Sequence, residues 1–234
     1  MQTCLLLCAL LVACTSARSL SARPDVEGLS YHHQQVVDEP LHPLVLEWIE
    51  SRKMESKSGI RERQLPAGVD IDQVINIAKS VWNIIEGGRP TLNTSFDYAT
   101  AVPSGVTEWT ELEYWADPVT ASYSAWVENI FKVKILELNY TVIAMPMGQY
   151  QGKGQYLTNV GIIPTIVRAP WSYTLSASTN VHGIVNVGSK DSPIAALQID
   201  LNWGASWMFK KFTKTEAYYV RGDGKPITSL NSQK

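Results

Sequence analysis

The chain has 234 residues with a formal net charge of −2, of which 18% are charged and 45% hydrophobic. This length suits one large β domain or two small domains, and the low net charge suggests neither nucleic acid nor an anionic surface as a partner. All three cysteines, Cys4, Cys8 and Cys14, precede residue 15. A chain that loses this segment would contain no thiol and no disulfide.

Residues 1–17 read as a secretory signal peptide. An uncharged apolar run from Cys4 to Cys14 precedes small residues around a cleavage point after Ala17, which is the usual order in signal peptides. The run is shorter than the about 20 apolar residues of a membrane-spanning helix. No Lys or Arg precedes it, which departs from the pattern, and Leu11–Cys14 also fits a bacterial lipoprotein box. We therefore predict a secreted, extracellular protein, with a lipoprotein as the alternative.

Residues 18–68 form a polar stretch in which 15 of 51 residues are charged, against 27 of the 166 that follow. Helical spacing occurs in one short piece around Trp48. These features predict a flexible leader or propeptide with one helix near residues 43–56. Arg52-Lys53 and Arg61–Arg63 would be basic cleavage sites for a processing protease.

Residues 70–86 show the clearest helical pattern, opened by a capping-box sequence. Apolar residues follow at spacings of three and four from Ile71 to Ile85, and Gly87-Gly88 would end the helix. A second apolar line through Ile77 and Ile84 indicates cover on two sides. The leader helix of the same chain, a second chain or a lipid could supply that cover, so oligomerisation through this helix is one option.

From residue 91 onward the apolar period changes to two. The alternating runs are Phe131–Ile135, Leu136–Ala144, Trp171–Ala177, Val181–Val187, Leu197–Trp203 and Ala217–Val220. The parity flips between Ile135 and Leu136, which predicts a β-bulge. Because short turns and no helices separate the runs, we predict a mainly β fold, an antiparallel β-sandwich or barrel-like body, within a domain spanning residues 69–234.

Large inward-facing side chains are expected to hold this body together without disulfides. Seven of the eight tryptophans follow residue 80, and each large aromatic buries about 150–250 Å². The inward set is expected to include Trp171, Tyr173, Leu197 and Leu201.

Two sequons predict N-glycosylation, at Asn93 and Asn139. Asn139 shares its strand parity with the polar Glu137 and Thr141, so a glycan there would point to water.

Arg221-Gly222-Asp223 is the tripeptide that many integrins bind. A guanidinium and a carboxylate held apart on a tight loop could bridge an acidic groove and a metal ion, which predicts a cell-attachment site. Gly-Asp-Gly is also ordinary hairpin chemistry.

The C-terminal part is basic and aromatic. Lysines and aromatic residues interleave there, namely Trp207, Phe209, Lys210, Lys211, Phe212 and Lys214. Such a mixture suits a membrane interface, a sulfated glycan or a mineral-associated anion. A solvated edge strand protected by lysine is the alternative.

Evidence for catalysis is limited to Glu111 and Glu113, which stand near Trp109, Tyr114 and Trp115. On one strand face the two carboxylates would lie about 7 Å apart, compatible with an inverting glycosidase. No serine-nucleophile elbow, phosphate loop or metal-ligand spacing is present. We therefore expect no catalytic residue, no metal and no cofactor.

One predicted strand has a hydroxyl-rich face, formed by Ser172, Thr174, Ser176 and Ser178. With apolar residues on its other face, it is similar in pattern to secreted β-pore formers. Any sandwich strand with a polar outer face has the same pattern.

These features favour a secreted, non-enzymatic extracellular protein, either matrix-associated or binding a glycan, a receptor or another extracellular surface. A membrane-active β-pore former is the first alternative. A carbohydrate-active enzyme is the second. Nucleic acid is not expected as a partner.

Overall fold

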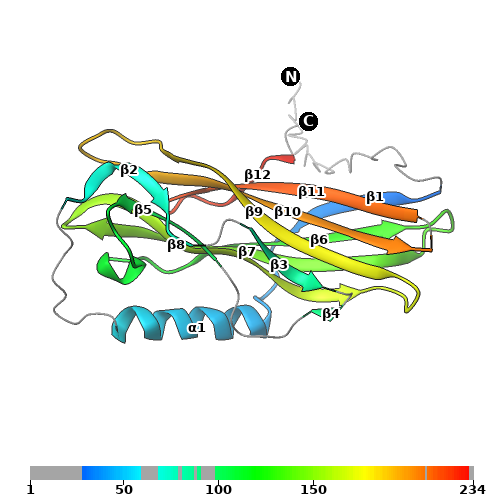
Figure 1. Cartoon of the computed structure of the whole chain (residues 1–234). Helices are drawn as coiled ribbons and strands as arrows, with labels where there is room; N and C mark the ends of the chain where they lie inside the picture. Colours follow the sequence, from blue (N-terminus) through cyan, green and yellow to red (C-terminus); the bar gives the residue numbers. More distant parts are fainter. Residues whose placement is uncertain are drawn as a thin grey trace, which may run out of the picture.

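The protein folds into two β-sheets that pack face to face, with one helix outside them (Figure 1). The computed structural model describes residues 28–58, 68–78, 81–86, 89–90, 98–208 and 210–231. All pairings between the described strands are antiparallel. The predicted mainly β antiparallel sandwich is therefore confirmed.

The strands of the first sheet are β1 (Ser30–Val36), β2 (Asp70–Asn76), β5 (Ala99–Ser104), β6 (Val119–Glu128), β7 (Lys134–Tyr150) and β8 (Lys153–Arg168). The strands of the second sheet are β3 (Val81–Glu86), β4 (Arg89–Pro90), β9 (Thr174–Asn186), β10 (Ala195–Trp207), β11 (Lys210–Arg221) and β12 (Thr228–Ser229). The described helical elements are α1 (Pro43–Ser58) and the short 3₁₀ helix η1 (Trp109–Glu111). The first sheet has the order β1-β6-β7-β8-β5-β2 and the second the order β12-β11-β10-β9-β3-β4.

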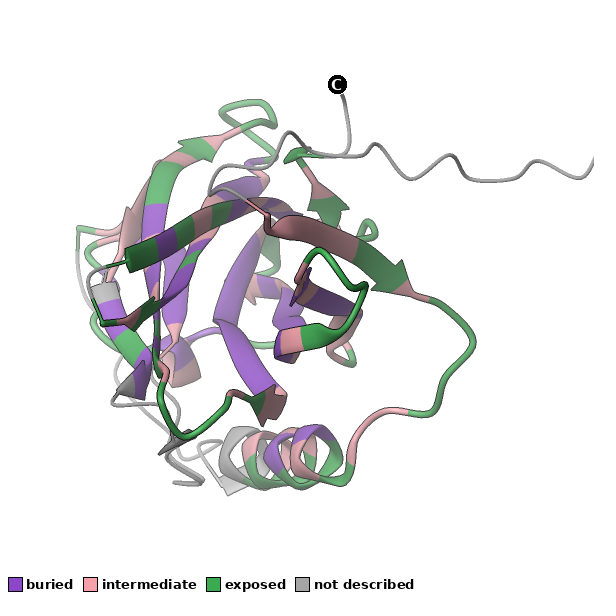
Figure 2. Cartoon of the chain, turned by 90° about the vertical axis from the view of Figure 1, so that its right-hand side faces the viewer, coloured by how far each residue is buried: buried purple, intermediate pink, exposed green. Residues whose placement is uncertain are grey.

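The core lies between the two sheets, where Figure 2 shows most of the buried residues. Along β10, Leu197, Ile199 and Leu201 are fully buried, whereas Asn202 between Leu201 and Trp203 is exposed. This alternation is the two-residue period of a strand with one wet face. Trp171 departs from the prediction, because it lies in the turn before β9 and is 99% exposed.

The predicted bulge is confirmed. Val127 of β6 pairs with Leu136 of β7, but the next residue, Glu128, pairs with Lys134, so Ile135 is the extra residue. An extra residue in one strand exchanges the faces of the strand beyond it. This is why the apolar parity changes at that point.

Helix α1 confirms the predicted short helix, and it lies on the outer face of the first sheet (Figures 1 and 2). Val45 and Trp48 pack there against Ile143 of β7 and Ile163 of β8. This cluster is separate from the core between the sheets, so α1 is attached by a small apolar contact.

The helix predicted over residues 70–86 is wrong. Asp70–Asn76 forms β2 at an edge of the first sheet, and Val81–Glu86 forms β3 in the second sheet. Oligomerisation through a helix of this segment, as predicted above, therefore has no helix to act through. Ile71, Val74 and Ile75 are β-branched residues, which suit the pleated surface of a strand.

Part of the expected leader belongs to the sandwich. Residues 30–36 form β1, which pairs along its whole length with β6, from Ser30 opposite Glu128 to Val36 opposite Ser122. This pairing brings Tyr31 and His33 to the interior side of the sheet.

Candidate functional site

Three loops gather at one end of the sandwich, at the right of Figure 1 and facing the viewer in Figure 2. They are residues 129–133 between β6 and β7, residues 169–173 between β8 and β9, and Met208 between β10 and β11. We call this group the loop end. The loops share one end because β6, β8 and β10 run toward it, and β7, β9 and β11 run away from it.

Large apolar side chains project into solvent from all three loops. The exposed fractions are 69% for Ile130, 78% for Phe131, 99% for Trp171 and 89% for Met208. Single exposed apolar residues are common on protein surfaces, but a group of them at one convex end is typical of an interaction site. Sequence reasoning missed this group, because it placed Phe131 and Trp171 on strands.

Hydrogen bonds from backbone amides to the side chain of Asn129 fix the shape of the first loop. The side-chain Oδ1 of Asn129 accepts from the amide of Phe131 at 2.9 Å and from the amide of Val133 at 3.1 Å. Lys132 has a φ of 61°, the left-handed conformation that reverses the chain. Ile130 and Phe131 are thereby held at the tip. Asn129, a turn-forming residue beside the alternating run, is the signal that could have identified this loop.

A ring contact joins the second loop to the third. The centroids of Tyr173 and Trp207 lie 4.9 Å apart with the planes tilted by 33°. Both residues are half-buried and pack against the core. The chain is therefore packed two residues after the exposed Trp171 and directly before the exposed Met208.

Cationic side chains surround the loop end. The exposed cations at this end are Lys132, Lys134, Arg168, Lys210 and Lys211. Among the described residues two carboxylates stand near them, and both are paired. Glu137 contacts Arg168 at 2.9 Å and Lys134 at 3.7 Å, while Glu128 contacts His32 at 3.3 Å. The end is therefore both apolar and positively charged.

The basic aromatic segment predicted near the C-terminus is only partly at this end. Lys210 and Lys211 lie at the loop end, but Phe212 is buried in the core and Lys214 lies over the ring of Tyr31 at 5.2 Å. Phe209 lies outside the described residues. On the neighbouring β9, Thr174 and Ser176 point outward, as predicted for its hydroxyl-rich face.

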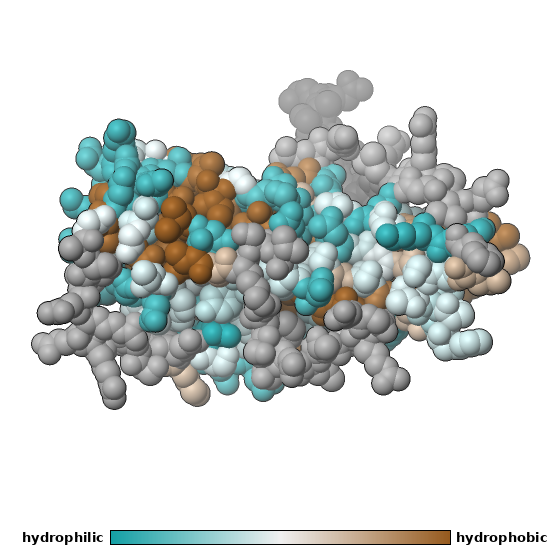
Figure 3. Space-filling model, in the orientation of Figure 1, coloured by the Kyte–Doolittle hydropathy of each residue, from teal (hydrophilic) through white to brown (hydrophobic). Residues whose placement is uncertain are grey.

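A second apolar area lies where β2 and β9 come together, visible as brown atoms on the near face toward the left of Figure 3. We call it the β2–β9 patch. Its exposed members are Val185 and Val187, with exposed fractions of 44% and 38%. Ile71 and Ile184 are half-buried against the core. These fractions are well below those at the loop end, so the patch is largely the rim of the core.

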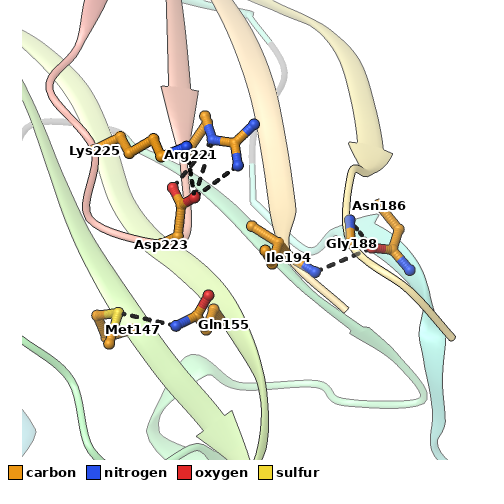
Figure 4. Close-up of polar contacts among 8 residues, drawn as sticks. All are labelled: Met147, Gln155, Asn186, Gly188, Ile194, Arg221, Asp223 and Lys225. Carbon is orange, nitrogen blue, oxygen red and sulfur yellow. Dashed lines mark hydrogen bonds and ion pairs between the residues drawn. The ribbon is translucent and has the colours of Figure 1, made fainter. Parts of the chain in front are cut away.

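The Arg221-Gly222-Asp223 segment closes β11 and lies at the opposite end of the sandwich; Figure 4 shows the side chains of Arg221 and Asp223. We call that end the turn end, made of residues 151–152, 187–194 and 222–227. Arg221 donates to both carboxylate oxygens of Asp223, with Nη2 at 2.6 Å and Nε at 3.1 Å, and Lys225 lies 3.7 Å from the same carboxylate. The two side chains expected to be held apart are thus paired with each other. Hydrogen bonds from Arg221 lower the pKa of Asp223.

Gly222 joins parts of both sheets. Its amide donates to the carbonyl of Ala195 at 2.7 Å, and its carbonyl accepts from the amide of Met147 at 2.9 Å. A Cβ atom here would lie 2.2 Å from the carbonyl oxygen of Gln155. Close packing of backbones therefore accounts for this glycine without a receptor.

The two glutamates of the enzyme alternative do not share a strand face. Glu111 lies in η1, where its Oε1 accepts from the Thr107 hydroxyl at 2.8 Å and from the Glu108 amide at 2.9 Å. Glu113 forms an isolated backbone bridge with Gln149. The geometry predicted for a catalytic pair is therefore wrong, and Glu111 caps a local turn.

Of the two sequons, Asn93 lies outside the described residues. Asn139 is half-buried on the outer face of β7, and its Oδ1 accepts from the Ser124 hydroxyl at 2.8 Å. Helix α1 covers Ile143, four residues further along the same strand. Glycosylation at Asn139 stays a prediction.

A polar cluster is buried between β1 and the second sheet. Nε2 of His33 lies 2.9 Å from the Tyr140 hydroxyl and 3.2 Å from the Tyr218 hydroxyl, and these two hydroxyls also bond to each other. The Tyr31 hydroxyl donates to Glu216. Burial raises the pKa of Tyr31, Tyr140 and Tyr218 and lowers the pKa of His33, so all four are uncharged at neutral pH.

The described part of the chain has no helix long and apolar enough to cross a membrane. Within the same residues, no group of three or more His, Cys, Asp or Glu side chains could hold a metal ion. No protein-family model, curated protein or solved structure gives a significant match to the chain.

Proposed function

We propose that this is a secreted, non-catalytic protein that attaches to an extracellular surface through its loop end. The observation that supports the proposal is the exposure of Ile130, Phe131, Trp171 and Met208 on three adjacent loop tips. Their placement on a packed, hydrogen-bonded base keeps them in solvent when the protein is free. Binding to a surface that covers these side chains would be favoured, because it removes them from water.

The free energy available from burying these four side chains suits reversible attachment. Full burial of one large apolar side chain contributes about 1.5–3 kcal/mol, so four contribute about 6–12 kcal/mol before costs. Loss of translational and rotational freedom opposes binding by about 4–15 kcal/mol. The apolar contacts therefore suit weak or moderate binding, and additional contacts from the cations around the loop end would strengthen it.

Cell attachment through Arg221-Gly222-Asp223 receives less support. Its guanidinium and carboxylate satisfy each other, and the Asp223 side chain is only 13% exposed. A receptor would have to break this pair before it could bind either group.

The test is binding of the fluorescently labelled protein to cultured animal cells, measured by flow cytometry over a range of protein concentrations. The loop-end variant combines Phe131→Ser and Trp171→Ser. We expect its affinity to fall by about a hundredfold or more, because about 1.5 kcal/mol or more is lost for each of the two side chains. Near-ultraviolet circular dichroism checks that the fold is kept.

A matched control replaces two exposed valines at the β2–β9 patch, with Val185→Ser and Val187→Ser. Unchanged binding of this control and of Asp223→Glu, together with loss in the loop-end variant, supports the proposal. Equal binding of the loop-end variant and the wild type would overturn it. A selective loss in Asp223→Glu would assign attachment to the tripeptide instead.

A further inference from the structure

Building on the proposed attachment, we infer that the surface is an anionic phospholipid bilayer, which the loop end enters at the level of the headgroups. Two different chemistries coincide there. Apolar and aromatic tips suit the boundary between headgroups and acyl chains, and cations suit the lipid phosphates and carboxylates. Each chemistry alone fits many partners, but together they fit a charged lipid interface.

The arrangement of the tips sets the orientation. Ile130 and Phe131 extend from the first sheet, Met208 extends from the second, and Trp171 lies on the loop that crosses between the sheets. Since both sheets contribute, the sandwich would stand on its end with its strands steeply inclined to the membrane plane. Trp171 is almost fully exposed, and its ring would be the deepest aromatic anchor.

Three of the five cations are free to face phosphate groups. Arg168 and Lys134 already contact Glu137. Among the described residues, no ion pair involves Lys132, Lys210 or Lys211, and all three are exposed. Lys132 follows Phe131 directly, so one loop tip presents an apolar ring and an ammonium group to the same interface.

The charge of the two ends is opposite. In the described residues the loop end carries the five cations named above and two carboxylates, Glu128 and Glu137. The turn end, taken together with the neighbouring residues 70–72 and 107–117, carries eight carboxylates, namely Asp70, Asp72, Glu108, Glu111, Glu113, Asp117, Asp191 and Asp223. Five cations accompany them, namely Lys53, which contacts Asp117 at 2.6 Å, and Lys153, Lys190, Arg221 and Lys225. An anionic surface would therefore attract the loop end and repel the turn end, which orients the molecule before contact.

Other occupants fit less well. In a symmetric dimer through the loop end, cations would lie opposite cations, which disfavours a second copy. A sulfated glycan would use the lysines but would leave Phe131, Trp171 and Met208 in water. The bilayer is the partner that uses both groups of side chains.

The experiment is co-sedimentation of the full-length purified protein with vesicles of phosphatidylcholine and with vesicles that also contain phosphatidylserine. We expect tighter binding to the anionic vesicles and weakening as salt is raised. The triple variant Lys132→Gln, Lys210→Gln and Lys211→Gln should lose about a hundredfold in affinity for anionic vesicles, since each cation contributes about fivefold. The variant Phe131→Ser with Trp171→Ser should lose binding to both kinds of vesicle.

The matched control removes three cations at the turn end, with Lys153→Gln, Lys190→Gln and Lys225→Gln, and should bind as the wild type does. Tryptophan emission should shift to shorter wavelength on anionic vesicles, and Trp171→Phe should remove most of the shift. Equal losses in both triple variants, or no preference for anionic vesicles, would overturn the inference.

The outcomes also separate this inference from the proposed function. Cell binding that depends on Phe131 and Trp171, with no binding to either kind of vesicle, would leave the proposed function standing and refute the lipid. Cell binding that a soluble sulfated glycan abolishes, without vesicle binding, would assign the lysines to a glycan. Dimerisation lost in the loop-end variant, measured by light scattering, would assign the surface to a second copy.

Discussion

The two ends of the sandwich differ in whether their side chains are bonded within the protein or exposed to solvent. At the turn end, Arg221 and Asp223 pair with each other and Gly222 lies against the backbone of Gln155. At the loop end, Phe131 and Trp171 extend into water, although the folded protein gains nothing from apolar side chains at these positions. The difference teaches that the turn end fastens the two sheets, whereas the loop end is available for a partner. A conspicuous motif such as Arg221-Gly222-Asp223 can thus have a structural role.

The largest effect expected concerns stability at the turn end. Gly222→Ala would place a Cβ atom 2.2 Å from the carbonyl oxygen of Gln155, so one backbone segment must move. We expect a loss of about 3 kcal/mol in the free energy of unfolding, at the upper end of the usual range for overpacking. Urea denaturation measures it, with the exposed Ser172→Ala at the loop end as the control. An unchanged midpoint would show that the sheets are not fastened here.

A smaller effect is expected for Asp223→Asn, which removes the ion pair with Arg221. We expect a loss of about 1 kcal/mol at neutral pH. Hydrogen bonds from Arg221 keep the pKa of Asp223 below its ordinary value of 3.8 in the folded protein. The unfolded chain therefore binds the proton first as pH falls, and the contribution, complete above about pH 5, is lost below pH 4. Unfolding of both proteins across this range should converge at low pH. A constant difference would contradict the pairing.

The smallest effect is expected for Trp171→Ser at the loop end. Because this side chain is 99% exposed, its removal should change the free energy of unfolding by less than about 0.5 kcal/mol. Thermal and urea unfolding check the value, with the buried Trp203→Ser as a destabilised reference. A large loss would mean that Trp171 belongs to the core and is not available to a partner.

Much of the β body could be predicted from the sequence, because strand parity is a local property. The alternation in β10 correctly placed Leu197 and Leu201 inside, and the parity flip at Ile135 located the bulge. The short helix around Trp48 was equally local. In each case the pattern of apolar residues within one segment is enough to predict the structure.

The segment from residue 70 to residue 86 could not be predicted in this way. Its two strands join different sheets, and β3 pairs with β9, whose residues follow about a hundred positions later. A register shift between Asp70 and Val74 in β2 and the break before Val81 together imitate helical spacing. Only the distant partners decide between the two structures.

The candidate site was missed for a related reason. An apolar period shows which face of a strand a residue occupies, but not where pairing stops. Phe131 and Trp171 follow the parity of their runs and nevertheless lie beyond the ends of β6 and β8. The ion pair between Arg221 and Asp223 was equally hidden, because side-chain direction in a tight turn depends on the fold around it.

The place of β1 has a consequence for maturation. Across the sandwich, Tyr31 reaches Glu216 and His33 reaches Tyr218, and His33 also contacts Tyr140 of its own sheet, so this strand contributes to the interior as well as to the sheet edge. A protease that cuts between Ser58 and Gly68 would produce a nicked molecule whose two pieces remain associated through the ladder of β1 and β6. Release of the N-terminal piece would require β1 to separate from β6.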